Sequence, residues 1–213
     1  MGLVQAQPQA EHCGGEEGEA DDRASSRAHR SPAQGDGQAA EDRLTDLLCV
    51  PITDQDAASD FDCGVPALNT YFHKRAVSND RRGLGKTYVL HGSSAALSVL
   101  GFYTLSMADV ETATLPRKHR SNVPTHPLPV ALIGRLARDL RAKGQSVGET
   151  LLVDAFRRIL PAASTLGCFG VIVDAKDADG VTFYQRYGFE PLPPERYPRR
   201  MFIAIETVRA AAG

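Results

Sequence analysis

The chain has 213 residues, of which 42% are hydrophobic and 23% charged, and these values fit one globular domain with some additional chain. No apolar run approaches the ~20 residues that a membrane-spanning helix requires, and the first residues lack the basic and apolar stretches of a secretory signal, so we expect neither a membrane protein nor a secreted one. The net charge of −2 is uneven: residues 1–43 hold nine of the 26 acids but only four of the 24 lysines and arginines, which leaves the remainder at about +3.

Residues 1–43 are rich in Gly, Ala, Gln, Glu, Asp and Ser and nearly free of Ile, Val, Leu and aromatic residues. Such a segment cannot bury enough apolar surface to offset its ordering entropy, so we expect a disordered acidic tail followed by one folded domain over residues 44–208. The four cysteines form no CxxC pair and no zinc-spaced cluster with histidine, which favours reduced thiols, no metal site and a cytoplasmic location.

The first half of the folded region alternates between β-rich and helical patterns. In chain order, the expected elements are a strand at 47–52, a turn at 60–64, a helix at 67–80 that is broken in two, a β-hairpin from 87–92 and 95–110, and a proline-rich loop at 112–129.

The second half contains two buried strands, each followed by a helix. In chain order, the expected elements are a central strand at 130–137, an amphipathic helix at 147–160, a buried strand at 169–175, a helix at 177–187 that ends with Gly188 in the C′ position, and strands at 189–192 and 201–206. The order β-α-α-β-β-β-α-β-α-β-β indicates an α/β sandwich with strands of mixed direction.

The segment from Arg135 to Leu152 runs from the central strand, through a short polar loop, into the helix. This arrangement points backbone N–H groups and the positive end of a helix dipole at one place, which suits a phosphate or pyrophosphate. Ser146 and Glu149 also fit the S-x-x-E capping box, in which their side chains bond the first N–H groups of the helix.

The same segment resembles motif A of the GNAT N-acetyltransferases, Q/R-x-x-G-x-G/A, with Lys143, Ser146 and Gly148 on its first, fourth and sixth positions. FYQRYGFEPL at 183–192 resembles motif B of that superfamily. The resemblance implies a GNAT fold: a mixed central sheet of six to seven strands, about four flanking helices and a V-shaped splay at the central strand. It also implies that acetyl-CoA is the co-substrate and that it is bound by Leu136, Ala137, Arg138, Lys143, Gly144, Gln145, Ser146, Val147, Gly148 and Glu149.

A narrower resemblance covers most of residues 47–206. The FDCG start at 61–64 and the PLPVALIGRLARD strand at 127–139 resemble GNAT toxins of the TacT and AtaT type. That resemblance implies a bacterial toxin that acetylates the α-amine of aminoacyl-tRNA and blocks translation. It further implies a ribbon-helix-helix antitoxin as partner and a homodimer as the assembly.

Motif A usually has glycine where this chain has Ser146. If the Ser146 hydroxyl caps the helix, it competes with the phosphate for N–H donors, and Glu149 adds a negative charge at an anion site. We therefore expect acetyl-CoA to bind with reduced affinity.

Tyr184 matches the general acid of the family, because a phenol can protonate the leaving thiolate, while Tyr187 is an alternative and packing is the competing interpretation. The central strand carries no carboxylate before Asp139, so a lysine acceptor would lack a base on that strand. An α-amine is closer to neutrality and needs less help, although Asp109 or Glu111 could act as the base. Arg135 is either a charge at the edge of the core or an acceptor-site residue.

Basic residues cluster at 74–86, 117–120 and 196–200, where they would either be solvated or contact tRNA phosphates. Two other functions remain open: a general GNAT enzyme that acts on a small amine or a protein, and a non-catalytic interaction protein with a degraded cofactor loop.

Overall fold

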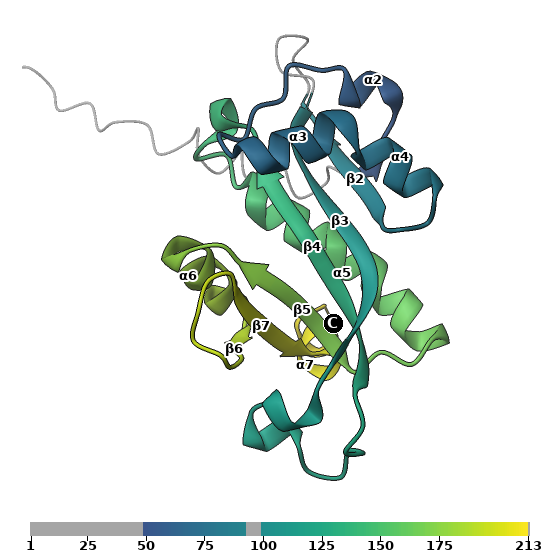
Figure 1. The fold of residues 1–213 in the computed structure, drawn as a ribbon, viewed down its shortest axis with the longest axis vertical. Helices are drawn as coiled ribbons and strands as arrows, with labels where there is room; N and C mark the ends of the chain where they lie inside the picture. Colours follow the sequence, from purple (N-terminus) through teal and green to yellow (C-terminus); the bar gives the residue numbers. More distant parts are fainter. Residues whose placement is uncertain (1–48, 93–98, 213) are drawn as a thin grey trace, which may run out of the picture. The chain divides into compact units, whose positions relative to one another are not determined.

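The computed structural model describes residues 49–92 and 99–212, which form a seven-stranded sheet with helices on both faces (Figure 1). The strands, in their order across the sheet, are β1 (Val50–Pro51), β2 (Lys86–His91), β3 (Val99–Val110), β4 (Leu128–Arg138), β5 (Gly170–Ala175), β7 (Arg199–Ala204) and β6 (Glu190–Pro191). Strands β4 and β5 run parallel, and the other neighbours are antiparallel. The predicted mixed α/β sheet is confirmed, whereas the predicted tail at 1–43 lies outside the described residues.

The helices also follow the expected order, with two additions. They are α2 (Asp54–Ala57), α3 (Pro66–Lys74), α4 (Ala76–Arg81), α5 (Val147–Thr165), α6 (Ala178–Arg186) and α7 (Ile205–Ala212), and three 3-10 turns are η1 (Thr112–Thr114), η2 (Arg117–His119) and η3 (Leu140–Ala142). The break between α3 and α4 and the C′ role of Gly188, at φ +84°, are confirmed. Helices α2 and α7 were not predicted.

Several predicted boundaries differ from the structure; the helix expected at 147–160, for example, extends to Thr165. The strand expected at 201–206 ends at Ala204, where the chain turns into α7, which buries Ile205 and Val208. The segment expected to be all loop at 112–129 contains η1 and η2, and β4 already begins at Leu128.

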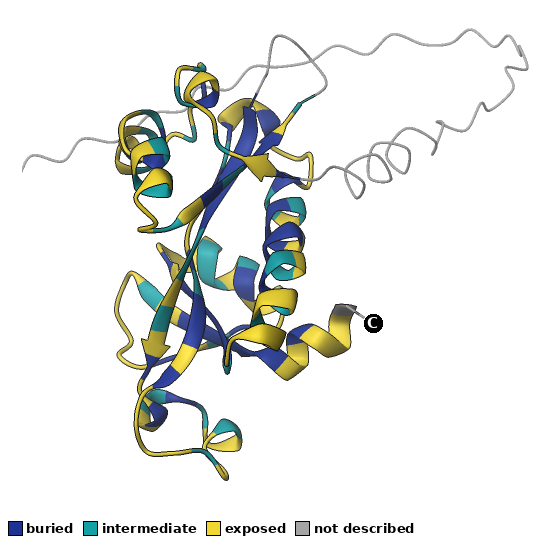
Figure 2. Cartoon of the chain, turned by 90° about the vertical axis from the view of Figure 1, so that its right-hand side faces the viewer, coloured by how far each residue is buried: buried dark blue, intermediate teal, exposed yellow. Residues whose placement is uncertain are grey.

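The sheet separates two layers of apolar side chains. On one face, here called the α5 face, Ile133, Leu151 and Tyr184 belong to a large core that joins α5, α6 and α7 to the strands. On the other, the α3 face, Phe72 and Phe102 pack under α3, and a third cluster includes Ile172. Figure 1 shows α3 in front of β3 and β4 and α5 behind them, and in Figure 2 the buried residues follow the strands and the inner sides of the helices.

The central strand β4 loses one of its two neighbours and changes the facing of its side chains at one point. Pairing between β4 and β5 ends at Ile133, opposite Val173, while β4 continues beside β3 as far as Arg138. The β3–β4 register also shifts there, because Leu105 pairs with Ile133 and Thr104 with Arg135, which leaves Gly134 as a bulge. The predicted splay between the two parallel strands is therefore confirmed, and a β-bulge marks its start.

A buried polar network ties the start of the described chain to α5. The Arg158 guanidinium donates to Asp154 at 2.9 Å, to the Tyr103 hydroxyl at 3.0 Å and to the Cys49 carbonyl, and Tyr103 donates to Asp154. The Arg158 guanidinium also lies 3.9 Å from the centroid of the Tyr88 ring. These contacts join α5, β3, β2 and Cys49, which precedes β1, around one charged pair.

Candidate active site

The predicted cofactor loop borders a cleft of about 470 Å³. The end of β4, the start of α5 and the end of α6 form its walls. Of the ten residues predicted to bind the cofactor, eight line this cleft, namely Leu136, Ala137, Arg138, Gly144, Ser146, Val147, Gly148 and Glu149. Lys143 and Gln145 are exposed and do not line it. Phe183, Arg186 and Tyr187 also line the cleft. They were not predicted as cofactor-binding residues, although their i, i+3, i+4 spacing places them on one face of a helix.

The start of α5 leaves several backbone donors free. The first helical bond of α5 runs from the Thr150 N–H to the Ser146 carbonyl. Among the hydrogen bonds of residues 49–92 and 99–212, the N–H groups of Val147, Gly148 and Glu149 donate to no group of the chain. Free N–H groups at a helix N-terminus suit a phosphate.

The predicted capping box is wrong. Ser146 is the N-cap residue of α5, but its backbone is left-handed, at φ 51° and ψ 17°, and its side chain makes no capping bond. A capping serine folds its hydroxyl back from the extended β region, which Ser146 does not occupy. The expected competition between this hydroxyl and a phosphate therefore loses its structural basis.

Glu149, the second member of the expected box, lies beside Tyr187 instead. Burial and the negative charge of Glu149 both raise the pKa of the Tyr187 phenol. The Glu149 carboxylate thus has a neighbour on α6, on the wall of the cleft opposite the loop.

The other end of the loop is anchored by Asp139, which is fully buried at the end of β4. Its carboxylate accepts bonds from the Arg141 guanidinium at 2.8 and 2.9 Å and from the Asp62 N–H at 3.1 Å. Although burial opposes it, this set of bonds lowers the pKa of Asp139. Asp139 therefore fixes both the FDCG turn and the cofactor loop to the splayed strand, which is a structural role.

Close packing against Gly101 also sets the position of α5. A Cβ atom at Gly101 would come within 2.7 Å of the Ala137 carbonyl and 3.0 Å of the Val147 side chain. Only glycine allows β3, the end of β4 and the first residue of α5 to approach this closely.

Tyr184, the predicted general acid, faces the core from α6 and is 9% exposed. Its ring lies 5.1 Å from Phe183 and 5.4 Å from Phe189, centroid to centroid. Burial and the negative charge of Asp174 raise the pKa of Tyr184 to about 12. Tyr184 does not line the cleft itself, but its neighbour Phe183 does.

The two carboxylates considered as bases, Asp109 and Glu111, line a different cleft, of about 550 Å³. This cleft also contains Asp174 and Arg200, whose side chains are joined by bonds of 2.9 and 3.1 Å. Asp174 is the same carboxylate whose charge acts on Tyr184.

Comparisons with curated proteins identify close relatives over most of the chain, although no protein-family model matches it. The chain is 33% identical over 162 residues to a tRNA-acetylating toxin of Mycobacterium tuberculosis, which covers 76% of this chain and 94% of the relative. It is 32% identical over 161 residues to a probable toxin TacT of Sinorhizobium fredii, covering 72% and 87% respectively. The chain belongs to the GNAT toxin family of the TacT and AtaT type.

Solved structures agree with this assignment. A tyrosine-to-phenylalanine variant of KacT matches with a TM-score of 0.71 and 28% identity, over 78% of this chain and 98% of that one. AtaT complexed with acetyl-methionyl-tRNAfMet matches with a TM-score of 0.70 and 30% identity, over 79% and 100%. A variant of AtaT bound to acetyl-CoA and the C-terminus of the antitoxin AtaR matches with a TM-score of 0.64 and 29% identity, over 78% and 98%.

The predicted basic clusters of this GNAT toxin are partly neutralised by the fold. In the first cluster Lys86 pairs with Asp80 at 2.9 Å, in the second Lys118 pairs with Glu190 at 3.0 Å, and in the third Arg200 pairs with Asp174. Exposed pairs of this kind contribute little stability, but they reduce the positive charge available to a polyanion.

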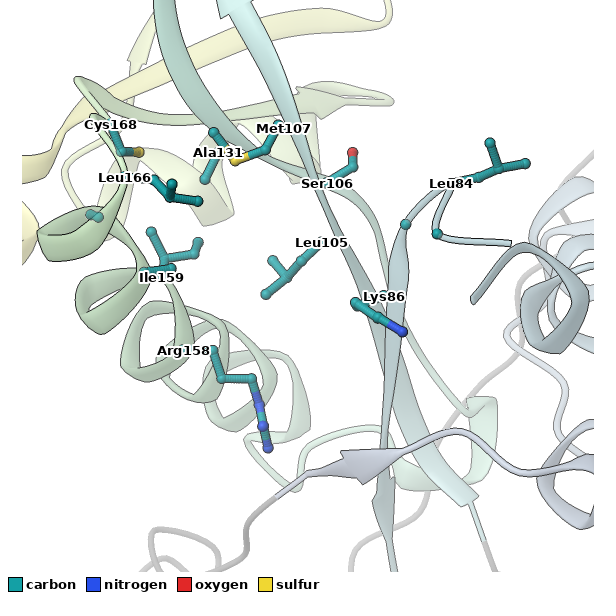
Figure 3. A pocket seen from close by; sticks show the side chains of 14 residues that line it. Leu84, Lys86, Leu105, Ser106, Met107, Ala131, Arg158, Ile159, Leu166 and Cys168 are labelled. Carbon is teal, nitrogen blue, oxygen red and sulfur yellow. The ribbon is translucent and has the colours of Figure 1, made fainter. Parts of the chain in front are cut away.

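A further groove of about 530 Å³ lies along the C-terminal half of α5, between that helix and strands β2 and β3 (Figure 3). Its walls are mainly apolar, including Leu105, Met107 and Ile159. Its two charged residues, Lys86 and Arg158, are engaged with Asp80 and Asp154. The groove lacks the free N–H donors of the cofactor loop, so it is not the candidate active site of this toxin.

None of the helices in the described part of the toxin combines the length and the apolarity that a membrane crossing requires. Within residues 49–92 and 99–212, no three His, Cys, Asp or Glu side chains converge as metal ligands.

Proposed function

We propose that this chain is an acetyl-CoA-dependent N-acetyltransferase that modifies the α-amine of aminoacyl-tRNA and thereby blocks translation. The observation that carries the proposal is the cleft at the splay of β4, where free N–H groups of α5 face the parted strand in a chain of this toxin family. The relative from Mycobacterium tuberculosis is a tRNA-acetylating toxin, and AtaT has been solved with acetyl-methionyl-tRNAfMet.

The residues of the loop fit the pyrophosphate of acetyl-CoA. The N–H groups of Val147, Gly148 and Glu149 supply donors and the helix dipole adds positive potential. Arg138 adds a cation to the wall of the cleft. Leu136 and Ala137, beyond the last β4–β5 pair, offer backbone groups to the pantetheine amides. When bound, acetyl-CoA supplies the acetyl group as a thioester.

Tyr184 is the proposed catalytic residue. A pKa of about 12 keeps its phenol protonated at neutral pH, so its O–H can donate to the sulfur as the C–S bond breaks. The phenol is then a weaker acid than a thiol, whose ordinary pKa is about 8.5. Full transfer of the tyrosine proton to the thiolate is therefore uphill, and the phenol acts mainly as a hydrogen-bond donor.

The proton that the leaving thiolate needs is matched by the proton that the attacking amine loses. The amine loses one proton as its new bond to the acetyl carbon forms, and the thiolate gains one as it leaves. An α-amine, with an ordinary pKa near ~8, has a larger neutral fraction at physiological pH than a lysine amine, whose ordinary pKa is about 10.4, so it needs less help from a base. This agrees with Asp139 being occupied by Arg141 and Asp62 rather than free to act as a base on the strand.

The proposal extends to partners and location. By analogy with AtaT, which binds the C-terminus of its antitoxin, we expect an antitoxin partner of the ribbon-helix-helix class. We also expect a homodimer and a cytoplasmic location, where charged tRNA and acetyl-CoA are found.

The test incubates the purified full-length chain with acetyl-CoA and a full set of charged tRNAs, followed by mass spectrometry of the released amino acids. We expect N-acetylated α-amines, lost in Tyr184→Phe and retained in Tyr187→Phe. Acetylation of a small amine or a protein with none on charged tRNA would support the general GNAT alternative. The absence of any thermal shift with acetyl-CoA would support the non-catalytic one.

A further inference from the structure

Arg135 occupies the point at which β4 has parted from β5. The last β4–β5 pair is at Ile133, Gly134 is the bulge, and Arg135 pairs with Thr104 of β3. Ala131 and Ile133 point to the α5 face, so regular alternation would place Arg135 there too. The bulge reverses the alternation and places Arg135 on the α3 face, where it meets Tyr71.

The Arg135 guanidinium is held by a ring rather than by a carboxylate. Its central carbon lies 3.7 Å from the centroid of the Tyr71 ring, and Tyr71 is 6% exposed and stacked near Phe102 at 6.4 Å. A cation–π contact orients the planar group without cancelling its charge.

Arg135 is an exposed cation with no acidic partner among residues 49–92 and 99–212. Salt bridges in the described part of the chain engage Arg141 and Arg200, among others, but not Arg135. A guanidinium that lies flat on a buried ring keeps its N–H edge available for bidentate contact with a phosphate. Its chemistry therefore selects an anion that approaches along the α3 face.

Two anions approach the splay in the proposed reaction. The donors proposed for acetyl-CoA lie on the α5 face, at the start of α5, whereas Arg135 lies on the opposite face of the same strand. We propose that Arg135, stacked on Tyr71, binds a backbone phosphate in the single-stranded 3′ end of the tRNA acceptor and so sets how far the aminoacyl group enters the splay. This inference rests on the proposed function.

The first test compares Arg135→Gln with Arg157→Gln, a matched control at an exposed arginine of α5 that forms no salt bridge within the described residues. We expect Arg135→Gln to raise the KM for charged tRNA about tenfold, with the KM for acetyl-CoA within about twofold of wild type, as the loss of one charge-assisted phosphate contact predicts. The control should change neither value. An unchanged KM for charged tRNA, or a change confined to acetyl-CoA, would overturn the inference.

A second measurement does not depend on catalysis. Fluorescence anisotropy of a labelled RNA minihelix that ends in single-stranded CCA gives its Kd at several salt concentrations. Loss of one phosphate contact should lower the slope of log Kd against log salt by about 0.7 in Arg135→Gln. Tyr71→Phe, which keeps the ring, should bind like wild type, whereas Tyr71→Leu should bind more weakly. Thermal unfolding of each variant, with Arg135→Lys as a second variant, separates loss of binding from loss of fold.

The two proposals fail in different ways. If wild type acetylates charged tRNA but Arg135→Gln matches it in KM and salt slope, the Arg135 site is wrong and the proposed function stands. If wild type acetylates no charged tRNA but binds the minihelix through Arg135, the proposed function is wrong and the phosphate site stands. If the minihelix binds equally to wild type and Arg135→Gln, the phosphate site is wrong in either case.

Discussion

Ser146 combines a strained backbone with a position next to the proposed phosphate site. Its left-handed conformation disfavours a residue with a Cβ atom, and glycine adopts it freely. The residues that follow, Val147 and Gly148, line the cleft, so the loop holds this conformation at the site at a cost in stability.

Replacing Ser146 by glycine tests how the backbone strain affects stability and cofactor binding. We expect Ser146→Gly to raise the free energy of unfolding by about 1 kcal/mol, because the strain is relieved. The Kd for acetyl-CoA should stay within about threefold of wild type, because the serine hydroxyl caps nothing. Urea unfolding and titration calorimetry check the two values. A tenfold tighter Kd would restore the idea that the hydroxyl competes with the phosphate.

Tyr184 gives a prediction for alkaline pH. Its pKa is about 12 in the folded chain and about 10 when unfolded, so the folded chain holds this proton more tightly. Its contribution to stability is therefore complete below pH 10 and is lost as the pH rises from 10 to 12. The loss should reach about 3 kcal/mol, since each pKa unit corresponds to 1.36 kcal/mol. Comparison of wild type with Tyr184→Phe by denaturant unfolding at pH 9 to 12 isolates this term, and parallel curves would contradict it.

The residues that line the cleft from β4, the loop and the start of α5 were the most predictable part of the site. The sequence places Leu136, Ala137, Arg138 and the Gly144–Glu149 loop together, because a strand, a short loop and a helix N-terminus meet in one place. It does not predict the left-handed backbone of Ser146, because S-x-x-E is also the pattern of a capping box, which requires an extended N-cap residue.

At the scale of elements, α5 is fixed to the sheet by both apolar and charged contacts. Asp154 is 3% exposed and shares its oxygens with Arg158, Tyr103 and the Cys49 N–H. In such a network, removal of one partner leaves the others buried without compensation.

Asp154→Ala should therefore destabilise the fold by about 3 kcal/mol or more, because it leaves the Arg158 charge partly buried and unpaired. Tyr103→Phe should cost less, about 1 kcal/mol, because Asp154 keeps its bond to Arg158. The double variant should lose less than the sum of the two, since both remove the same hydrogen bond. Chemical unfolding measures all three, with Asp179→Ala, an exposed change on α6, as the control.

The order of the elements could be predicted from periodicity, but their ends could not. Ile203 and Ile205 continue an alternating strand pattern, yet α7 begins at Ile205 and packs Ile205 and Val208 into the main core. This packing involves residues far away in the chain, and no local pattern reports it. The short helix α2 was missed for another reason: its capping box, Thr53 with Asp56, uses aspartate in the place of the expected glutamate or glutamine.

At the scale of the whole molecule, each face of the sheet binds a different substrate in the proposed reaction. The α5 face presents helix N–H groups to acetyl-CoA, the α3 face presents Arg135 to tRNA, and the splay joins them. All of these features lie between Cys49 and Ala212, which is the part of the chain that the structure describes.

A chain that begins at residue 44 should therefore acetylate charged tRNA with a kcat/KM within about twofold of the full chain, because polar terminal segments tolerate removal well. Its melting temperature should change little. Rates measured on both forms with the same charged tRNA check this. A large rise in KM for tRNA in the shorter form would instead assign the acidic segment a role in substrate binding.

The bulge at Gly134 makes the pairing of β4 with β3 as important as the composition of the strand. Before the bulge the odd-numbered residues face α5, and after it the even-numbered residue Leu136 does, opposite Tyr103. Single substitutions along the strand leave this phase unchanged. If the strand kept every residue but paired without the bulge, regular alternation would instead turn Arg135 into the main core and Leu136 out of it, exchanging the surfaces for the two substrates. The irregular pairing at Gly134 therefore decides which face of the sheet carries the Arg135 cation.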